Sequence, residues 1–159
     1  MDFARIRRDV AASLLLAALV FLAFGGALRC GFVWFDDHGY VYENPAVTGG
    51  LTQAGLRWAW TTTHMYNWHP LTWLAHMADA ELYGLNPAGH HLSSLLLHAA
   101  NAILLFFFLR RATGHGPAAL AAAALWAVHP LRAESVVWIS ERKDVLAAFF
   151  GLLALLAYV

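Results

Sequence analysis

Long apolar runs alternate with polar and aromatic stretches along this chain. The first apolar run, residues 10–28, follows a basic stretch at residues 5–8. At about 19 residues, it has the length of a membrane-spanning helix and exceeds the apolar core of a signal peptide. A cleaved signal peptide remains the alternative, although Arg29 directly before Cys30 excludes a lipoprotein cleavage site.

Three more apolar runs follow and predict further spans over residues 91–109, 117–130 and 145–159. The third run is short for a span and ends at Pro130. It therefore predicts either a short helix closed by the proline or a longer helix with a kink. The fourth run stays apolar up to Val159, which indicates a fragment or the start of a longer polypeptide.

The segment between the first two spans, residues 29–90, is rich in aromatic side chains and turn formers. It is too apolar for a disordered linker and predicts an ordered loop on the membrane surface. One short helix is expected after Thr52 as N-cap, and another over residues 71–85. The second is expected to lie in the membrane interface, with Trp73 at headgroup depth and Asp79 facing elsewhere.

Composition supports this pattern, because 60% of the residues are hydrophobic and only 13% are charged, about half the usual soluble share. The formal net charge is zero, so nothing suggests a nucleic-acid partner. The single cysteine permits no internal disulfide. We therefore predict an all-α membrane protein in which residues 1–159 form the N-terminal part of one membrane domain with about four spans.

Basic residues set the expected orientation. The N-terminal arginines precede the first span, and Arg110 and Arg111 follow the second, so both groups lie on one side. The positive-inside rule makes that side cytoplasmic. The N-terminus is then cytoplasmic, and the loops at residues 29–90 and 131–144 share the outer side.

Two groups in the long loop could carry chemistry. Asp36 and Asp37 are adjacent carboxylates just after the first span, and either could accept a proton or hold a cation. His69, between Trp68 and Pro70, could bind phosphate or relay a proton. The alternatives are the solvated start of a loop for the aspartates and a structural turn for the histidine.

The second outer loop ends in the charged stretch Glu141-Arg142-Lys143-Asp144. Its cations stand on the outer side against the positive-inside bias, and charges beside a span are costly unless they pair or meet a ligand. Arg142 and Lys143 suit a phosphate or pyrophosphate group. Glu134 would add a further acid if this segment is helical. The alternative is a charge cluster that merely ends a helix.

The chain contains nine histidines. They do not show the paired spacing with carboxylates that zinc sites prefer, so a metal transporter is disfavoured. His98 and Asn101 lie one helical turn apart within the second span. We expect them to hydrogen-bond to neighbouring helices.

Several motifs, taken in order, resemble the N-terminal membrane region of the transmembrane-and-tetratricopeptide-repeat (TMTC) proteins, in particular their bacterial relatives. They cover nearly the whole chain from Phe32 onward. The motifs are Asp36-Asp37, Glu43-Asn44-Pro45, Asn67-Trp68-His69-Pro70-Leu71-Thr72-Trp73-Leu74, Gly84-Leu85-Asn86-Pro87, His90-His91-Leu92, Leu97-His98-Ala99-Ala100-Asn101-Ala102, Val128-His129-Pro130-Leu131-Arg132-Ala133-Glu134-Ser135-Val136 and Trp138-Ile139-Ser140-Glu141-Arg142-Lys143-Asp144. Animal members tend to have arginine where this chain has His69, and usually carry tetratricopeptide repeats, of which no copy occurs here.

The resemblance implies a GT-C type glycosyltransferase in the bacterial inner membrane. Its substrates would be a polyprenyl-phosphate sugar, mannose-like, and a Ser or Thr hydroxyl of an acceptor protein. No resident cofactor is certain, and a divalent cation is possible. The alternatives are a non-catalytic membrane anchor for protein-binding repeats and a protein that binds the polyprenyl lipid carrier.

The resemblance also implies a role for each group of candidate residues. Asp36 and Asp37 are the candidate catalytic bases. Arg142, Lys143 and His69 are the candidate donor-phosphate ligands. The acids expected to support them are Glu134, Glu141 and Asp144.

Overall fold

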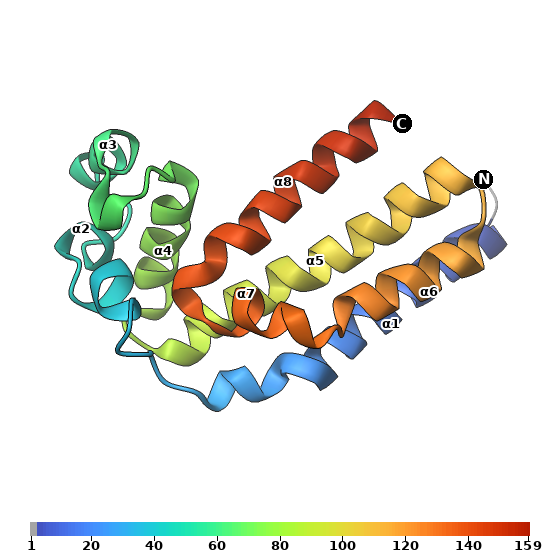
Figure 1. The fold of residues 1–159 in the computed structure, drawn as a ribbon, viewed down its shortest axis with the longest axis horizontal. Helices are drawn as coiled ribbons and strands as arrows, with labels where there is room; N and C mark the ends of the chain where they lie inside the picture. Colours follow the sequence, from blue (N-terminus) through green and yellow to red (C-terminus); the bar gives the residue numbers. More distant parts are fainter. Residues whose placement is uncertain (1–2) are drawn as a thin grey trace.

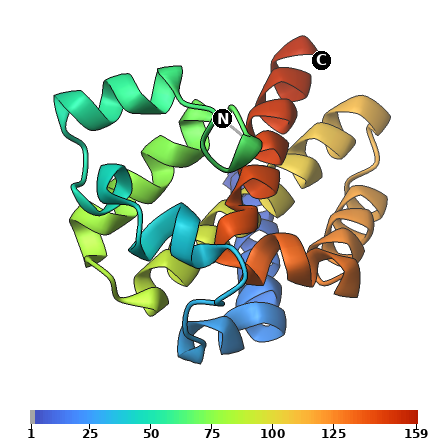
Figure 2. The same ribbon diagram turned by 60° about the vertical axis from the view of Figure 1, so that its left-hand side comes forward.

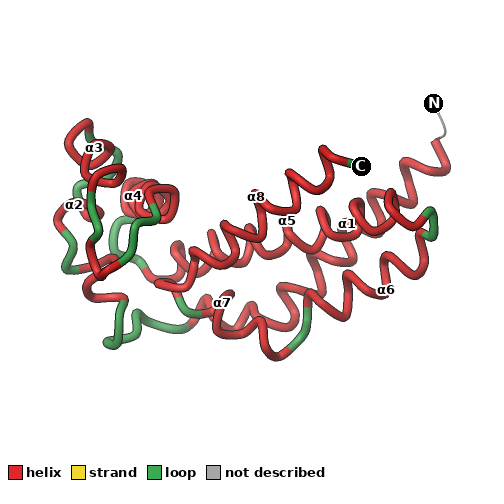
Figure 3. Tube along the Cα trace, turned by 45° about the horizontal axis from the view of Figure 1, so that its top comes forward, coloured by secondary structure: helices red, strands yellow, loops and turns green. Residues whose placement is uncertain are grey.

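The computed structural model describes residues 3–159, and every regular element in that range is helical (Figure 3). The predicted all-α class is therefore confirmed. The main helices are α1 (Phe3–Phe24), α2 (Pro45–Thr48), α3 (Gln53–Thr61), α4 (Pro70–Tyr83), α5 (Pro87–Thr113), α6 (Gly116–Ala127), α7 (Ala133–Val137) and α8 (Arg142–Tyr158). Short 3₁₀ turns cover Gly25–Arg29, His64–Tyr66, Pro130–Arg132 and Ile139–Glu141, and a π-helical turn covers His38–Tyr42.

Two helical segments are long and apolar enough to cross a membrane: Phe3–Arg29 and Pro87–Thr113. Helix α6 has 12 residues, below the roughly 20 that a span needs, and α8 runs from Arg142 to Tyr158, next to the last residue of the sequence. The predicted count of four spans is therefore not confirmed. The third apolar run follows the short-helix alternative, because α6 ends at Ala127 before the His129-Pro130 pair.

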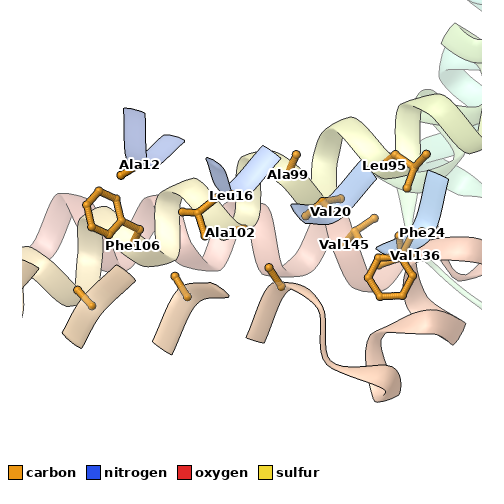
Figure 4. Close-up of a cluster of buried hydrophobic side chains, with 13 residues drawn as sticks. Ala12, Leu16, Val20, Phe24, Leu95, Ala99, Ala102, Phe106, Val136 and Val145 are labelled. Atoms are coloured by element: carbon orange, nitrogen blue, oxygen red, sulfur yellow. The ribbon is translucent and has the colours of Figure 1, made fainter. Parts of the chain in front are cut away.

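Helices α1, α5, α6 and α8 form an elongated bundle (Figure 1). Small side chains line much of its core, which lets the backbones of α5 and α6 approach closely. Figure 4 shows this core, in which alanines face larger side chains from α1 and α5. The buried members are Ala12, Leu16, Val20, Phe24, Leu95, Ala99, Ala102, Phe106, Ala119, Ala123, Ala127, Val136 and Val145.

Polar side chains also join these helices, as the sequence predicts. Asn101 of α5 donates to the backbone oxygen of Val145 in α8, 2.8 Å away. The Nε2 atom of His98 lies 2.9 Å from the backbone oxygen of Ala127 in α6. The expected bonds between helices are thus confirmed, and α5 is tied to both of its neighbours.

A second group of elements stands at one end of the bundle. We call residues 32–83, which include α2, α3 and α4, the aromatic lobe; Figure 2 shows it beside the bundle from another side. Its buried members, with Ile139 from the second loop, are Tyr40, Val41, Val47, Ala59, Trp73 and Met77. Thr52 caps α3 by accepting a hydrogen bond from the Gly55 N–H at 3.0 Å, which confirms the predicted start of that helix.

The orientation predicted for α4 is partly wrong. Trp73 is fully buried against Tyr40 and Trp58 rather than at headgroup depth. Asp79, expected to face away from the packed side, is also buried. The reason is that the loop folds back over this face of α4. Leu82, from the predicted apolar stripe, remains on the outside.

The opposite end of the bundle carries the basic residues. Arg110 of α5 forms an ion pair with Asp9 of α1, so the two arginine groups lie at the same end. The lobe lies at the other end, together with the segment 130–144 (Figure 1). The sidedness of the membrane itself stays a prediction.

Candidate active site

Asp37 connects the two predicted outer loops. Its carboxylate is fully buried and accepts hydrogen bonds from the Ser140 N–H at 3.0 Å and the Ser140 hydroxyl at 2.5 Å. The other oxygen accepts from the Val33 N–H at 2.8 Å. Because Asp37 accepts three hydrogen bonds from its own fold, this geometry describes a structural clamp. Its predicted role as a catalytic base stays a prediction.

Asp36 differs from its neighbour. Its side chain is partly exposed, and over the described residues 3–159 its carboxylate makes no hydrogen bond. Its backbone oxygen accepts from the Tyr40 N–H at 3.0 Å, at the turn that leads into the lobe. The clamp formed by Asp37 therefore fixes the backbone while the Asp36 carboxylate stays available to a ligand.

Tyr40 marks the centre of a small group of ionisable side chains. Burial raises the pKa of the Tyr40 hydroxyl, the nearby Lys143 lowers it, and Asp36 and Glu141 raise it. Asn67 donates a hydrogen bond to this hydroxyl at 3.0 Å. The geometry agrees: Asp36 is joined to Tyr40 through its backbone oxygen, and Lys143 lies over the Tyr40 ring with Glu141 beside it.

Lys143 and His69 complete this group. The Lys143 ammonium lies 2.5 Å from Glu141 and 5.9 Å from the centroid of the Tyr40 ring. The His69 ring lies against Tyr40, with a centroid distance of 5.5 Å. Burial, with a smaller contribution from Lys143, lowers the pKa of His69 to about 4. His69 is therefore a neutral imidazole near pH 7, able to donate or accept one hydrogen bond.

We call Asp36, Tyr40, His69, Glu141 and Lys143 the candidate site. It is assembled from the aromatic lobe and from Glu141 and Lys143 at the start of α8, which lie more than 70 positions further along the sequence. A carboxylate and an ammonium around one partly open place could bind a proton-bearing nucleophile and an anionic group together.

Arg142 lies apart from this site, in the interior. Its guanidinium is completely buried and forms an ion pair with Asp79 of α4. It also donates to the backbone oxygen of His90 at 2.6 Å and to the Ser94 hydroxyl at 3.3 Å. Through these three bonds, Arg142 joins α4, α5 and α8. Its predicted contact with a donor phosphate stays a prediction.

The remaining predicted acids do not join the site by any contact among residues 3–159. Glu134 is exposed in the first turn of α7. Asp144 accepts a hydrogen bond from the Ser135 hydroxyl at 2.9 Å. Only Glu141, of the three supporting acids, contacts a member of the candidate site.

Several residues in these arrangements were missed from the sequence. The sequence predicts that Asp79 faces away from the apolar side of its helix, it gives Asn67 and Ser140 no role beyond membership of a motif, and it does not single out Tyr40. The signal for Asp79 was its place in an otherwise apolar helix, because such an acid usually has a cationic partner. Nothing in the sequence marks Tyr40 among the many aromatic residues.

One histidine lies beside an acid: the Nδ1 atom of His90 is 3.5 Å from the Asp79 carboxylate. In the part of the chain that the structure describes, no group of three His, Cys, Asp or Glu side chains could hold a metal ion. The possible divalent cation stays a prediction.

The fold, taken with its apolar helices, is that of an all-helical membrane protein. The chain is similar to Protein O-mannosyl-transferase Tmtc1 of Drosophila melanogaster, at 32% identity over 95% of this chain and 18% of that protein. It is 34% identical to Protein O-mannosyl-transferase TMTC1 of Mus musculus over 92% of this chain and 16% of the relative. It is 36% identical to Protein O-mannosyl-transferase TMTC2 of Homo sapiens over 64% of this chain and 13% of the relative.

These similarities confirm the resemblance drawn from the motifs: the chain is a relative of the TMTC proteins. It spans less than a fifth of the length of each of these three relatives. No protein-family model matches the chain. No solved structure matches it either.

Proposed function

We propose that this chain is part of a membrane glycosyltransferase. The enzyme would transfer a mannose-like sugar from a polyprenyl-phosphate donor to a Ser or Thr hydroxyl of a protein. The printed sequence would supply the acceptor side and part of the phosphate side of its site. The observation that carries the proposal is that Tyr40 contacts both loops: its N–H bonds to the backbone oxygen of Asp36, and its ring lies beneath Lys143, which pairs with Glu141. The names of the relatives, all Protein O-mannosyl-transferases, support the same activity.

The proposed reaction is a single displacement. Asp36 accepts the proton of the acceptor hydroxyl while that oxygen forms a bond to the anomeric carbon of the sugar. The bond between this carbon and the phosphate oxygen breaks, and polyprenyl phosphate leaves. Attack from the face opposite the phosphate inverts the anomeric centre.

Two members of the candidate site would act on the phosphate of the donor. Lys143 stabilises the negative charge that develops on the leaving oxygen. Neutral His69 donates a hydrogen bond to the same group, and Tyr40 holds the Lys143 ammonium in place through its ring. Arg142 acts indirectly, because its ion pair with Asp79 fixes the start of α8 and hence the position of Lys143.

The lipid tail of the donor would lie in the bilayer, and its phosphate would lie at the membrane surface. In a bacterial inner membrane with the predicted orientation, the site faces the outer side. Several exposed aromatic side chains of the lobe suit an interfacial position. They include Trp34, Phe35, Trp60 and Trp68.

The test is a sugar-transfer assay with the full-length protein, a polyprenyl-phosphate mannose donor and an acceptor protein. We expect Asp36→Asn to lower turnover by about a hundredfold or more, since it removes a general base. Lys143→Met should lower turnover by about a hundredfold, since it removes a charge that stabilises the leaving group. Glu134→Gln, which removes an exposed carboxylate outside the site, is the matched control and should keep wild-type turnover.

The results of the binding and transfer assays distinguish the proposed enzyme from the two alternative functions. Wild-type protein that binds polyprenyl phosphate without transferring sugar would support a lipid-carrier protein instead. Neither binding nor transfer would support a membrane anchor. Transfer that is unaffected by Asp36→Asn would remove this residue as the base.

A further inference from the structure

An open cavity of about 1150 Å³ lies at the end of the bundle that is remote from the candidate site. It is bounded by the first turns of α1, the last turns of α5 and the beginning of α6, with Leu156 of α8 on one side. The candidate site and the aromatic lobe lie at the opposite end (Figure 1). The cavity therefore has no part in the proposed sugar transfer.

The charged lining of this cavity is mostly basic. Four arginines contribute to it, Arg5 and Arg8 from α1 and Arg110 and Arg111 from α5, against the single acid Asp9. Asp9 is engaged with Arg110, whose guanidinium also lies 5.2 Å from the centroid of the Phe106 ring. With Arg5 set aside, Arg8, Arg110 and Arg111 still face the single acid Asp9, so the charged lining of the cavity is net positive.

The remaining walls are apolar. Phe106 and Leu120 line the cavity from α5 and α6, and Leu156 lines it from α8. Both helices that carry the arginines are the ones long and apolar enough to span a membrane, and the arginines stand at their ends. The cavity therefore offers cationic donors at headgroup depth and an apolar surface that continues along the helices toward the hydrocarbon.

Arginines at the end of a span commonly point into solvent and serve only to orient the protein. Here, however, two helices about a hundred positions apart in the sequence direct their arginines to a common cavity with an apolar wall. Basic recesses between membrane helices are typical sites for anionic lipid headgroups. Guanidinium groups bind phosphate oxygens in a paired geometry.

We propose that this cavity binds an anionic phospholipid, with its phosphate between the arginines of α1 and α5 and an acyl chain against Phe106, Leu120 and Leu156. A free phosphate ion shares the headgroup chemistry. It would not use the apolar wall, so the lipid is the occupant to which we commit.

The test uses the full-length protein in vesicles of phosphatidylglycerol and phosphatidylcholine in equal proportion. The protein is then released in mild detergent, and the lipids that stay bound are counted by native mass spectrometry. Wild-type protein should retain phosphatidylglycerol in preference to phosphatidylcholine. Each cavity arginine replaced by glutamine should lower this preference by about fivefold.

The decisive variant is Arg8→Gln/Arg111→Gln, which removes two exposed side chains that line the cavity. Its control is Arg7→Gln/Arg57→Gln, which removes two exposed arginines outside the cavity, one of them adjacent to Arg8. Loss of the preference in the first variant alone supports the site. Equal loss in both variants, or no preference in wild type, overturns it.

Competition with inorganic phosphate distinguishes a bound lipid headgroup from a bound free phosphate ion. Added in excess, it should leave retention of phosphatidylglycerol largely unchanged, because it cannot replace the acyl contacts. Complete displacement would overturn the lipid assignment in favour of an ion site. Because none of these measurements involves sugar transfer, their failure would leave the proposed function untouched.

Discussion

The bundle and the aromatic lobe are held together in different ways. The bundle packs small and medium apolar side chains over a long distance, such as Ala99 of α5 and Ala123 of α6. The lobe is short and relies on aromatic rings and on buried polar pairs where it meets the bundle, chiefly Asp79–Arg142 and Asp37–Ser140. Stability in the bundle is thus spread over many weak contacts, whereas the lobe depends on a few strong ones, which also position the candidate site.

The largest effect is expected at the buried ion pair. Arg142→Met leaves the Asp79 carboxylate without its cation in the interior, which should cost about 3–5 kcal/mol of stability. Thermal unfolding of the full-length protein would measure this. The double variant Arg142→Met/Asp79→Leu should recover much of the loss, because removing both charges leaves no unpaired ion.

Arg57→Met is the matched control for that experiment. Arg57 is exposed on α3, so its loss should change stability by less than about 0.5 kcal/mol. If Arg142→Met unfolded no more easily than Arg57→Met, the lobe would not depend on this pair. The proposed difference between the lobe and the bundle in what stabilises them would then be wrong.

The next effect concerns the two adjacent aspartates. Asp37→Asn places an amide N–H₂ against donors that now bond to a carboxylate, which should destabilise the protein by about 1.5–3 kcal/mol. Asp36→Asn removes a carboxylate that is partly exposed and should leave the melting temperature almost unchanged. Melting curves of both variants, measured alongside the transfer assay, check this division.

The reverse result would exchange the two roles. A stable Asp37→Asn protein that has lost transfer, next to an unstable Asp36→Asn protein, would make Asp37 the base and Asp36 the clamp.

The sequence predicts the bundle better than the lobe. Apolar runs locate α1, α5, α6 and α8, and the spacing of His98 and Asn101 correctly predicts bonds between helices, because helical periodicity is a local signal. Thr52 likewise marks the start of α3 through local capping chemistry. The number of full spans is not fixed by these signals, because α6 covers only Gly116–Ala127 and is shorter than the apolar run at residues 117–130 suggests.

The candidate site is only partly predictable for a related reason. The motifs point to Asp36, His69 and Lys143 as residue types, and the structure places all three beside Tyr40. Which aspartate stays free depends on Ser140, and which cation is buried depends on Asp79. Both partners are distant in sequence, so no local pattern could separate Asp36 from Asp37 or Lys143 from Arg142.

A third prediction tests the packing of the bundle. Ala123→Leu inserts a larger side chain into a fully buried position of α6 and should destabilise the protein by about 1–3 kcal/mol. Ala122→Leu makes the same change at the adjacent exposed position and should be nearly neutral in a bilayer. Equal melting temperatures for the two variants would show that α6 does not pack closely against α5.

The smallest effect is a pH dependence that belongs to the lobe. Burial lowers the pKa of His69 to about 4, and burial also lowers that of His76 well below its usual value. As pH falls below about 6.5, the unfolded chain takes up protons on these histidines while the folded chain does not. Stability is therefore complete above pH 6.5 and is lost as pH falls from there toward 4.

His69→Gln should reduce this loss of stability at acidic pH, because glutamine does not titrate. A plot of melting temperature against pH should then fall less steeply between pH 6.5 and 4.5 in the variant than in wild type. The difference between the two proteins at pH 8, where His69 is neutral in both the folded and unfolded chain, corrects for any packing change. Parallel plots would mean that His69 takes up its proton as easily in the folded lobe as in the unfolded chain. The imidazole would then not be held neutral beside Lys143.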